Sequence, residues 1–194
     1  MHLTHKAGLA LALLTVGGLV AAPAHAQNLV TNPGFETGNF TGYTASGPVY
    51  VSNGIPHTGS YAAEFPGVNQ FGHLSQSIAT TAGDTYNISF FLLNGSGPAN
   101  EFKASFAGVQ GVDVVNANAF PYTQYSFTAV ATGTSSVLQF DGFQNPSAFF
   151  LDDISVTDAA PVPEASSVVS LGLLLVLGLG GVAVSRRRKA GAAR

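Results

Sequence analysis

Asp152 is the residue of this sequence that most clearly requires a hydrogen-bond or cation partner. In the run 149–156, strand alternation would place it on one face with three apolar residues, Phe150, Ile154 and Val156. A carboxylate among apolar neighbours is costly unless it is hydrogen-bonded or bound to a cation. Between residues 27 and 158 the chain has a single basic residue, Lys103, so a cation from outside the chain is the simpler partner.

The other polar residues do not indicate catalysis. The same segment has two histidines, His57 and His73, whose spacing is not that of a metal motif, and the chain has no cysteine. It contains neither a Gly-x-Ser-x-Gly nucleophile elbow nor a phosphate-binding glycine loop. Asp152 and Asp153 are adjacent, so alternation would point them to opposite faces and prevent them from acting as a facing acid–base pair. We therefore expect a protein that is not an enzyme.

Charge narrows the classes of partner. Between residues 27 and 158, one lysine stands against nine acidic residues, which gives a net charge of −8, whereas the whole chain carries −3. Nucleic acids and other anionic polymers are bound by clusters of Lys and Arg, so we expect no nucleic-acid partner. The charge is compatible with neutral sugars and with divalent cations.

Both ends of the chain are typical of targeting segments. Residues 1–26 are predicted to be a signal peptide, because an apolar run is followed by Ala24 and Ala26 in an A-x-A cleavage site. Signal peptidase would then leave Gln27 as the first mature residue. Near the other end, residues 159–164 form a proline-rich linker. The apolar stretch 165–185, at ~1.5 Å per residue, just spans a ~30 Å hydrocarbon core and predicts one transmembrane helix.

The C-terminal segment also carries a recognisable order of elements. The element Val162-Pro163-Glu164-Ala165 precedes the apolar stretch, and a tail of residues 186–194 follows it and opens with four basic residues, Arg186, Arg187, Arg188 and Lys189. The basic cluster predicts a cytoplasmic tail by the positive-inside rule. This order resembles the PEP-CTERM sorting signal that exosortase-type transpeptidases recognise in Gram-negative bacteria. Ala165 stands where the second proline of that family's Val-Pro-Glu-Pro element is expected.

The resemblance implies a route for the protein. It would be exported, held for a time in the inner membrane and processed by an exosortase-like transpeptidase at an element containing Pro163 and Glu164. Its final place would be the cell surface or the extracellular matrix.

The segment 27–158 has the pattern of an all-β domain. Short apolar runs alternate with Gly, Pro, Asn, Ser and Thr, as in a sandwich or barrel. In the run 85–90 the alternation is strict, which predicts a single face for Tyr86, Ile88, Phe90 and Leu92. The expected strands are 28–30, 49–51, 60–65, 74–78, 86–93, 102–106, 125–130, 136–140 and 149–157.

Three landmarks extend this prediction to a family. The mature segment opens with Asn32-Pro33-Gly34-Phe35-Glu36, continues through Gly59-Ser60-Tyr61-Ala62 and closes with Asp152-Asp153-Ile154. In this order they resemble the galactose-binding-like jelly rolls, with the family 4/9/22 carbohydrate-binding modules as the nearest type. The resemblance implies a jelly-roll β-sandwich over residues 27–158, and it supports fold better than ligand.

The same resemblance implies a structural calcium ion where the first and last strands meet. Calcium prefers carboxylate and carbonyl oxygens, which agrees with the requirement of Asp152 for a partner. We expect Glu36 and Asp152 as ligands, with carbonyl groups near Thr58 and Ser60. The alternative is that Glu36 caps a turn and Asp152 accepts backbone N–H groups, whereas Asp153 would be solvated.

A sugar site would need an aromatic platform and planar polar groups. The chain has no tryptophan, and its fourteen phenylalanines are expected mostly in the core, so four tyrosines are the better candidates: Tyr43, Tyr50, Tyr122 and Tyr125. The amide side chains that could contact a sugar are Asn69, Gln70, Gln110, Gln124 and Gln139. The sequence thus predicts a protein that binds or organises extracellular polysaccharide. The alternative is a structural or adhesive surface protein that has no sugar site.

Overall fold

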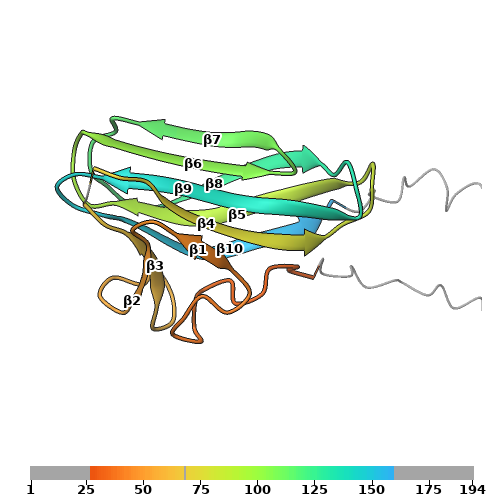
Figure 1. Ribbon diagram of the computed structural model, residues 1–194, viewed down its shortest axis with the longest axis horizontal. Helices are drawn as coiled ribbons and strands as arrows, with labels where there is room; N and C mark the ends of the chain where they lie inside the picture. Colours follow the sequence, from red (N-terminus) through yellow and green to blue (C-terminus); the bar gives the residue numbers. More distant parts are fainter. Residues whose placement is uncertain (1–26, 68, 160–194) are drawn as a thin grey trace, which may run out of the picture.

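The fold consists of two antiparallel β-sheets, seen in a computed structural model that describes residues 27–67 and 69–159 (Figure 1). The first sheet has the order β1-β4-β9-β6-β7, and its strands are Thr44–Ser46, Gly72–Ala79, Ser135–Gln144, Asn100–Phe106 and Val109–Val115. The second has the order β2-β3-β10-β5-β8, with strands Tyr50–Ser52, Ala62–Phe65, Phe149–Asp158, Thr85–Asn94 and Phe120–Val130. The prediction of an all-β sandwich is confirmed for this part of the chain.

The core lies between the two sheets and follows the period-two pattern of the sequence. On β5, the side chains of Tyr86, Ile88, Phe90 and Leu92 are all buried, as the alternation predicted. The first sheet faces them with the buried aromatic residues Phe102, Phe106 and Phe140. Fully burying one such side chain contributes roughly 1.5–3 kcal/mol, so an aromatic core compensates for the missing disulfides.

The last strand, β10, departs from simple alternation. Phe149 and Leu151 lie in the core, and so do Ile154 and Val156, although the two pairs have opposite parity. The register with β5 shifts between Asp152 and Ser155, and Asp153 adopts a left-handed backbone with φ of 47°. This β-bulge inserts one residue and changes which side chains face the core. The prediction that Phe150 and Asp152 share a face with Ile154 and Val156 is therefore wrong.

One predicted strand is absent from the described residues, and two observed strands were not predicted. Residues 28–30 form no ladder, although Leu29 N–H donates to the carbonyl of Val156 at 2.9 Å. Strands β1 and β7 were not predicted; β1 is short, and β7 contains Gly111. A Cβ at Gly111 would lie 2.0 Å from the Phe127 ring of β8, so the glycine lets an aromatic side chain close the sandwich between β7 and β8.

The two ends of the described chain lie at the same end of the sandwich (right in Figure 1). Ala159 N–H donates to the carbonyl of Thr85 at the start of β5. The loops around residues 95–99 and 145–148 join at the opposite end, where Asn145 N–H donates to the carbonyl of Ala99. With about ten residues per strand at ~3.3 Å each, roughly 30 Å separates the two ends.

Within residues 27–67 and 69–159, no helix is long and apolar enough to cross a membrane. The predicted signal peptide, transmembrane helix and basic tail, together with Pro163 and Glu164 of the linker, lie outside the described residues.

Candidate functional site

Asp152 is fully buried, and its carboxylate is surrounded by backbone donors. The Oδ2 atom accepts N–H groups from His57 at 2.8 Å and Thr58 at 3.2 Å, and the Oδ1 atom accepts the N–H of Asp153 at 2.7 Å. Burial raises the pKa of Asp152, and these three hydrogen bonds oppose that shift by favouring the charged form. The carboxylate therefore ties the last strand to the loop before β3.

The bulge turns Asp153 toward the same loop. Its Oδ2 atom lies 2.6 Å from His57 Nδ1, and its Oδ1 atom accepts the Thr58 hydroxyl at 2.6 Å. A Cβ added at Gly34 would lie 3.4 Å from Asp152 Oδ1 and 3.7 Å from Asp153 Oδ1, so both carboxylates approach one backbone segment. The prediction that Asp153 points away from Asp152 is wrong, because alternation does not hold through the bulge. The Asp153 side chain is 28% exposed and is paired with His57 and Thr58.

Glu36 holds the next part of this loop. Both of its carboxylate oxygens lie 3.0 Å from the N–H of Ser60, and Oε1 also accepts the N–H of Tyr61 at 3.1 Å. Gly59, with φ of +66°, lies directly against the carboxylate, where a Cβ would be 2.3 Å from Oε1. Glu36 thus caps the turn, one of the two roles considered for it.

Glu36 and Asp152 are the predicted calcium ligands, and the groups around them can be compared with the ligands that calcium prefers. The groups that face the carboxylates of Glu36, Asp152 and Asp153 are N–H and O–H donors, whereas calcium requires converging oxygen ligands. Residues 27–67 and 69–159 contain no group of three or more His, Cys, Asp or Glu side chains placed to hold a metal. In this geometry the carboxylates of Glu36, Asp152 and Asp153 have protein donors as partners without an ion.

Calcium binding by Glu36 and Asp152 stays a prediction that chelation tests. The thermal unfolding midpoint would be measured for the full-length chain in excess EDTA and in excess calcium. A midpoint raised by calcium would support the metal site. The same midpoint in both solutions would indicate that the loop before β3 is stabilised by hydrogen bonds from N–H groups to Glu36 and Asp152, without calcium.

The four candidate tyrosines lie in different parts of the molecule. Tyr43 packs against Phe35 with ring centroids 5.4 Å apart, and its buried hydroxyl has no hydrogen-bond partner in the described structure. Tyr50, on β2, is 58% exposed. Tyr122 donates its hydroxyl to the carbonyl of Ile55 at 2.6 Å, whereas Tyr125 stacks on Phe90 at 5.8 Å. The structure does not bring them into one platform.

The outer face of the second sheet is partly covered by the loop that carries His57. The imidazole ring lies flat on Phe91 of β5, with centroids 3.9 Å apart and planes 17° apart, and Tyr122 leans on it at 4.9 Å. This packing buries Asp152 and leaves little open surface above β10. A site that receives a long ligand is better sought on the first sheet.

The outer face of the first sheet presents polar side chains in rows. His73, Asp141, Lys103 and Asp113 stand opposite one another across β4, β9, β6 and β7. The next row contains Ser75, Gln139 and Ser105. The strand residues between these rows are buried in the core, so the polar rows point away from it.

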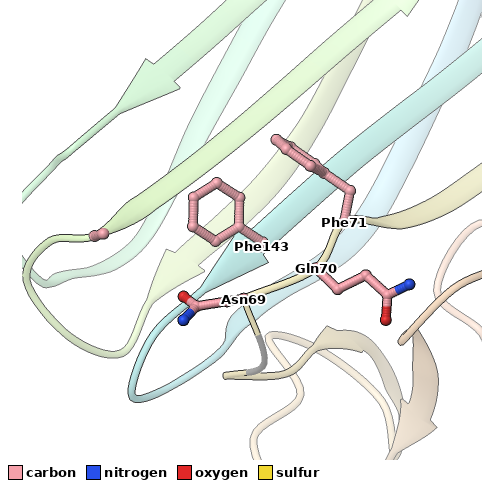
Figure 2. Close-up of a pocket in the computed structure, with 5 residues that line it drawn as sticks. Asn69, Gln70, Phe71 and Phe143 are labelled. Atoms are coloured by element: carbon pink, nitrogen blue, oxygen red, sulfur yellow. The ribbon is translucent and has the colours of Figure 1, made fainter.

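An aromatic pocket adjoins these rows at the end of the sheet remote from the chain ends. Its volume is about 320 Å³, and it is lined by Asn69, Gln70, Phe71, Ala99 and Phe143. Figure 2 shows the rings of Phe71 and Phe143 side by side above the two amide side chains. The ring centroids lie 4.9 Å apart with planes at 74°, so the two rings form adjacent walls at a steep angle.

A second, more polar pocket shares the Phe71 ring. It measures about 240 Å³ and is lined by Phe71, His73, Lys103, Gln139 and Asp141. Asp141 Oδ1 lies 2.5 Å from His73 Nδ1, and both of its oxygens accept Gln139 Nε2 at 2.9 Å. Its charged and amide groups are therefore held in fixed positions beside an aromatic ring.

Lys103 is the cation of this pocket. It forms an ion pair with Glu101 on the same strand, and the hydrogen bond between them raises the pKa of Lys103. Its Nζ atom lies 5.8 Å from the centroid of the Phe71 ring, within the range of a cation–π contact. The ammonium group stays charged and remains available as a donor.

A buried amide network supports the loops that form the aromatic pocket. Gln144 Nε2 donates to Asn94 Oδ1 at 2.6 Å and to the Ser96 carbonyl at 2.9 Å. Asn100 Nδ2 donates to the carbonyl of Ala117 at 2.9 Å. Gln144 follows Phe143 on β9 and points to the opposite face, so one strand end supplies both a pocket wall and its support.

Gly47 sets the position of the Phe71 backbone. It has φ of +68°, and a Cβ there would lie 2.4 Å from the Phe71 carbonyl oxygen. We expect Gly47→Ala to lower stability by more than the ~1–2 kcal/mol of left-handed strain, because the added Cβ would also displace the Phe71 backbone. Chemical denaturation measures the loss.

Gly83→Ala is the matched control for this substitution. Gly83 has φ of +90°, but an added Cβ would meet nothing within 4 Å. We expect this variant to lose only the stability that the backbone strain costs. Equal losses of stability in the two variants would contradict the role given to Gly47.

Some of the residues that line the two pockets were predicted from the sequence. Asn69, Gln70 and Gln139 were among the predicted amide contacts, and they line the two pockets. Phe71 and Phe143 were missed because phenylalanine was assigned to the core. A signal was available for Phe143, since it continues the outward alternation of Gln139 and Asp141 along β9.

Comparison with known proteins identifies the fold. No family model and no curated protein matches the chain. Among solved structures, a CBM61 module in complex with β-1,4-galactotriose is 24% identical with a TM-score of 0.57, over 69% of this chain and 99% of that one. The CBM22-1 xylan-binding domain from Paenibacillus barcinonensis is 17% identical with a TM-score of 0.51, over 73% and 100%.

A longer solved structure, which contains a catalytic module as well, shows the same likeness of fold. The xylanase 10B fragment of Clostridium thermocellum, which combines CBM22-1 and GH10 modules and is complexed with xylohexaose, is 21% identical with a TM-score of 0.51. The match covers 69% of this chain and 29% of that one. At these identities the likeness establishes the fold alone. Residues 27–67 and 69–159 therefore have the fold of the carbohydrate-binding modules, as the three sequence landmarks predicted.

Proposed function

We propose that this protein is a non-catalytic module that binds a neutral polysaccharide across the outer face of its first sheet. The observation that carries the proposal is the pair of adjoining pockets that share Phe71, one aromatic and one polar. Carbohydrate sites combine an apolar surface for the faces of sugar rings with a few fixed polar groups for their hydroxyls. The modules with this fold whose structures contain galactotriose or xylohexaose lend further support.

The polar groups match what a sugar hydroxyl requires. A hydroxyl both donates and accepts hydrogen bonds, so it pairs best with a mixture of donors and acceptors. Asp141 supplies acceptors, Lys103 supplies donors, and Gln139 supplies its amide oxygen. Asp141 and Gln139 are already oriented by their mutual hydrogen bonds, which lowers the entropy lost when a ligand binds.

Charge favours neutral polymers over anionic ones. The segment between residues 27 and 158 carries a net charge of −8, and Lys103, its one basic residue, is paired with Glu101. An anionic polysaccharide would meet Asp113 and Asp141 in the same row as this lysine. We therefore expect neutral glycans to be retained in preference to uronic-acid polymers.

A glycan array with the full-length chain in mild detergent tests the proposal. The expected result is retention of one or more neutral polysaccharides, with binding that does not weaken as salt is raised. Retention of no glycan at all would overturn the proposal and favour a structural or adhesive surface protein that lacks a sugar site. Retention of acidic polymers alone, abolished by salt, would also contradict it.

Export and sorting form the second part of the proposal. The sequence supports delivery through the inner membrane, release by an exosortase-like transpeptidase and a final place at the cell surface or in the extracellular matrix. The pocket lies roughly 30 Å from the strand end that leads to residue 159, so a domain attached there would present the pocket outward. A surface protein could thus bind matrix polysaccharide before or after release.

We expect Glu164→Ala to block release, because the sorting enzyme would lose the one acidic residue of the linker element. Intact mass of membrane and extracellular fractions measures this. The unmodified chain should give an extracellular species that begins at Gln27 and ends near Pro163, and the variant should stay in the membrane fraction. A chain that keeps Arg194 in both cases would indicate a plain anchor and contradict the sorting proposal.

A further inference from the structure

We propose that the pocket between Phe71, Phe143 and Ala99 is a subsite for an acetyl group carried by the bound polysaccharide. This inference rests on the proposed function, since it assigns a substituent to a ligand that the neighbouring polar pocket would hold. It names a class of ligand, an acetylated neutral glycan, that the fold alone does not specify.

The two pockets differ in chemistry although they share the Phe71 ring. The polar pocket adds His73, Lys103, Gln139 and Asp141 to that ring. The aromatic pocket adds Phe143 and Ala99, with Asn69 and Gln70 as its polar side chains. A sugar hydroxyl placed against Phe143 and Ala99 would give up hydration without a partner, which is costly. A methyl group would gain from the same apolar walls.

The amide groups at this pocket supply what the rest of an acetyl group needs. Asn69 Oδ1 accepts a hydrogen bond from Asn145 Nδ2 at 2.9 Å, which fixes the side chain and leaves its own NH₂ group as a donor. Gln70 is exposed, and no hydrogen bond to its amide occurs among the described residues. An acetyl carbonyl only accepts hydrogen bonds, so it matches two amide donors beside an apolar wall.

The size and rigidity of the pocket suit a small substituent. Its volume of about 320 Å³ lies at the lower end of the roughly 300–1,000 Å³ of small-molecule sites, enough for part of one sugar unit and its substituent. The Ala99 wall is held by the hydrogen bond from Asn145 N–H to the Ala99 carbonyl at 3.0 Å. The short Ala99 side chain leaves the space that the substituent would fill.

Matched pairs of neutral glycans test this inference. The probes are β-1,4-linked oligosaccharides of N-acetylglucosamine against those of glucose with equal length, and acetylated xylan against the same xylan after mild alkali. Neither pair differs in charge. We expect at least one acetylated member to bind about tenfold more tightly than its partner, through methyl burial and one or two hydrogen bonds to its carbonyl.

Two variants of the full-length chain complete the experiment. Ala99→Leu fills the pocket and should remove the preference for the acetylated member. Gly97→Ala is the control in the same loop, because an added Cβ there meets nothing within 4 Å, and it should keep the preference. Thermal unfolding shows that both variants are folded.

The outcomes separate this inference from the proposed function. Equal binding of both members of every pair, or a preference that survives Ala99→Leu in a folded variant, would overturn the acetyl subsite and leave polysaccharide binding intact. Binding to no glycan in the array or in these pairs would overturn both.

Discussion

Replacing Phe71 and Phe143 together with alanine should reduce polysaccharide binding at least about thirtyfold. The two rings are the aromatic walls of the pocket, and Phe71 also faces the polar groups beside it. Aromatic residues that anchor a binding site typically contribute ~2 kcal/mol or more, which corresponds to about thirtyfold in affinity. Titration calorimetry with a glycan retained on the array measures the change. Both side chains are partly exposed, so the variant should stay folded.

Val137→Ala is the control for this pair. Val137 is 49% exposed on the same strand as Phe143, six residues away, or about 20 Å along β9. We expect its affinity to match that of the unmodified chain. If the double phenylalanine variant binds normally and Tyr50→Ala or Tyr122→Ala does not, the site belongs to the tyrosines predicted from the sequence.

Asp152→Ala should lower the free energy of unfolding by about 3 kcal/mol, and the unfolding midpoint by about 10 °C. The substitution would leave three partly buried N–H groups, of His57, Thr58 and Asp153, without their acceptor. Burial raises the pKa of Asp152, so removing the charge recovers part of this loss. Three unsatisfied donors at about 1 kcal/mol or more each outweigh that gain.

Asp158→Ala is the matched control on the same strand. Asp158 is exposed at the end of β10, and its loss should change stability by less than about 0.5 kcal/mol. Chemical denaturation of both variants measures the difference. An Asp152→Ala chain as stable as the Asp158→Ala chain would show that the buried carboxylate does not hold the loop before β3.

Much of the fold was predictable because the strands follow a local rule. The run 85–90 alternates strictly, and it lies within β5 with the expected face in the core. Strands β6, β9 and β10 also contain their predicted ranges, because their apolar residues lie between segments rich in turn residues. Strand β7 escaped prediction because Gly111 interrupts its apolar pattern, and its place depends on Phe127, sixteen residues later.

The bulge in β10 could not be derived from alternation. Asp153 adopts a left-handed backbone conformation. This conformation is stabilised by contacts with His57 and Thr58, almost a hundred residues earlier in the chain. Its insertion changed the predicted faces of Phe150 and Asp152 and turned Asp153 inward. The requirement for a partner of Asp152 was predicted correctly, and backbone N–H groups satisfy it.

The sequence predicted the amide side chains that line the two pockets, and it did not predict their aromatic walls. The amide candidates Asn69, Gln70 and Gln139 lie at the pockets. Gln139 is on the outward face of β9, whereas Asn69 and Gln70 lie in the loop before β4. The aromatic platform was assigned to tyrosines on the general preference of phenylalanine for cores. Phe71 and Phe143 are exceptions that depend on the register between β4 and β9, which no single strand reveals.

An NMR titration of the labelled full-length chain would locate the proposed sugar site residue by residue. The ligand would be a neutral glycan retained on the array, and the observable is the chemical-shift change of each assigned residue. We expect the largest changes at Phe71, His73, Gln139 and Phe143, which line the two pockets at the outer face of the first sheet. Changes confined to the loop of His57 and to Tyr50 or Tyr122 on the second sheet would contradict it.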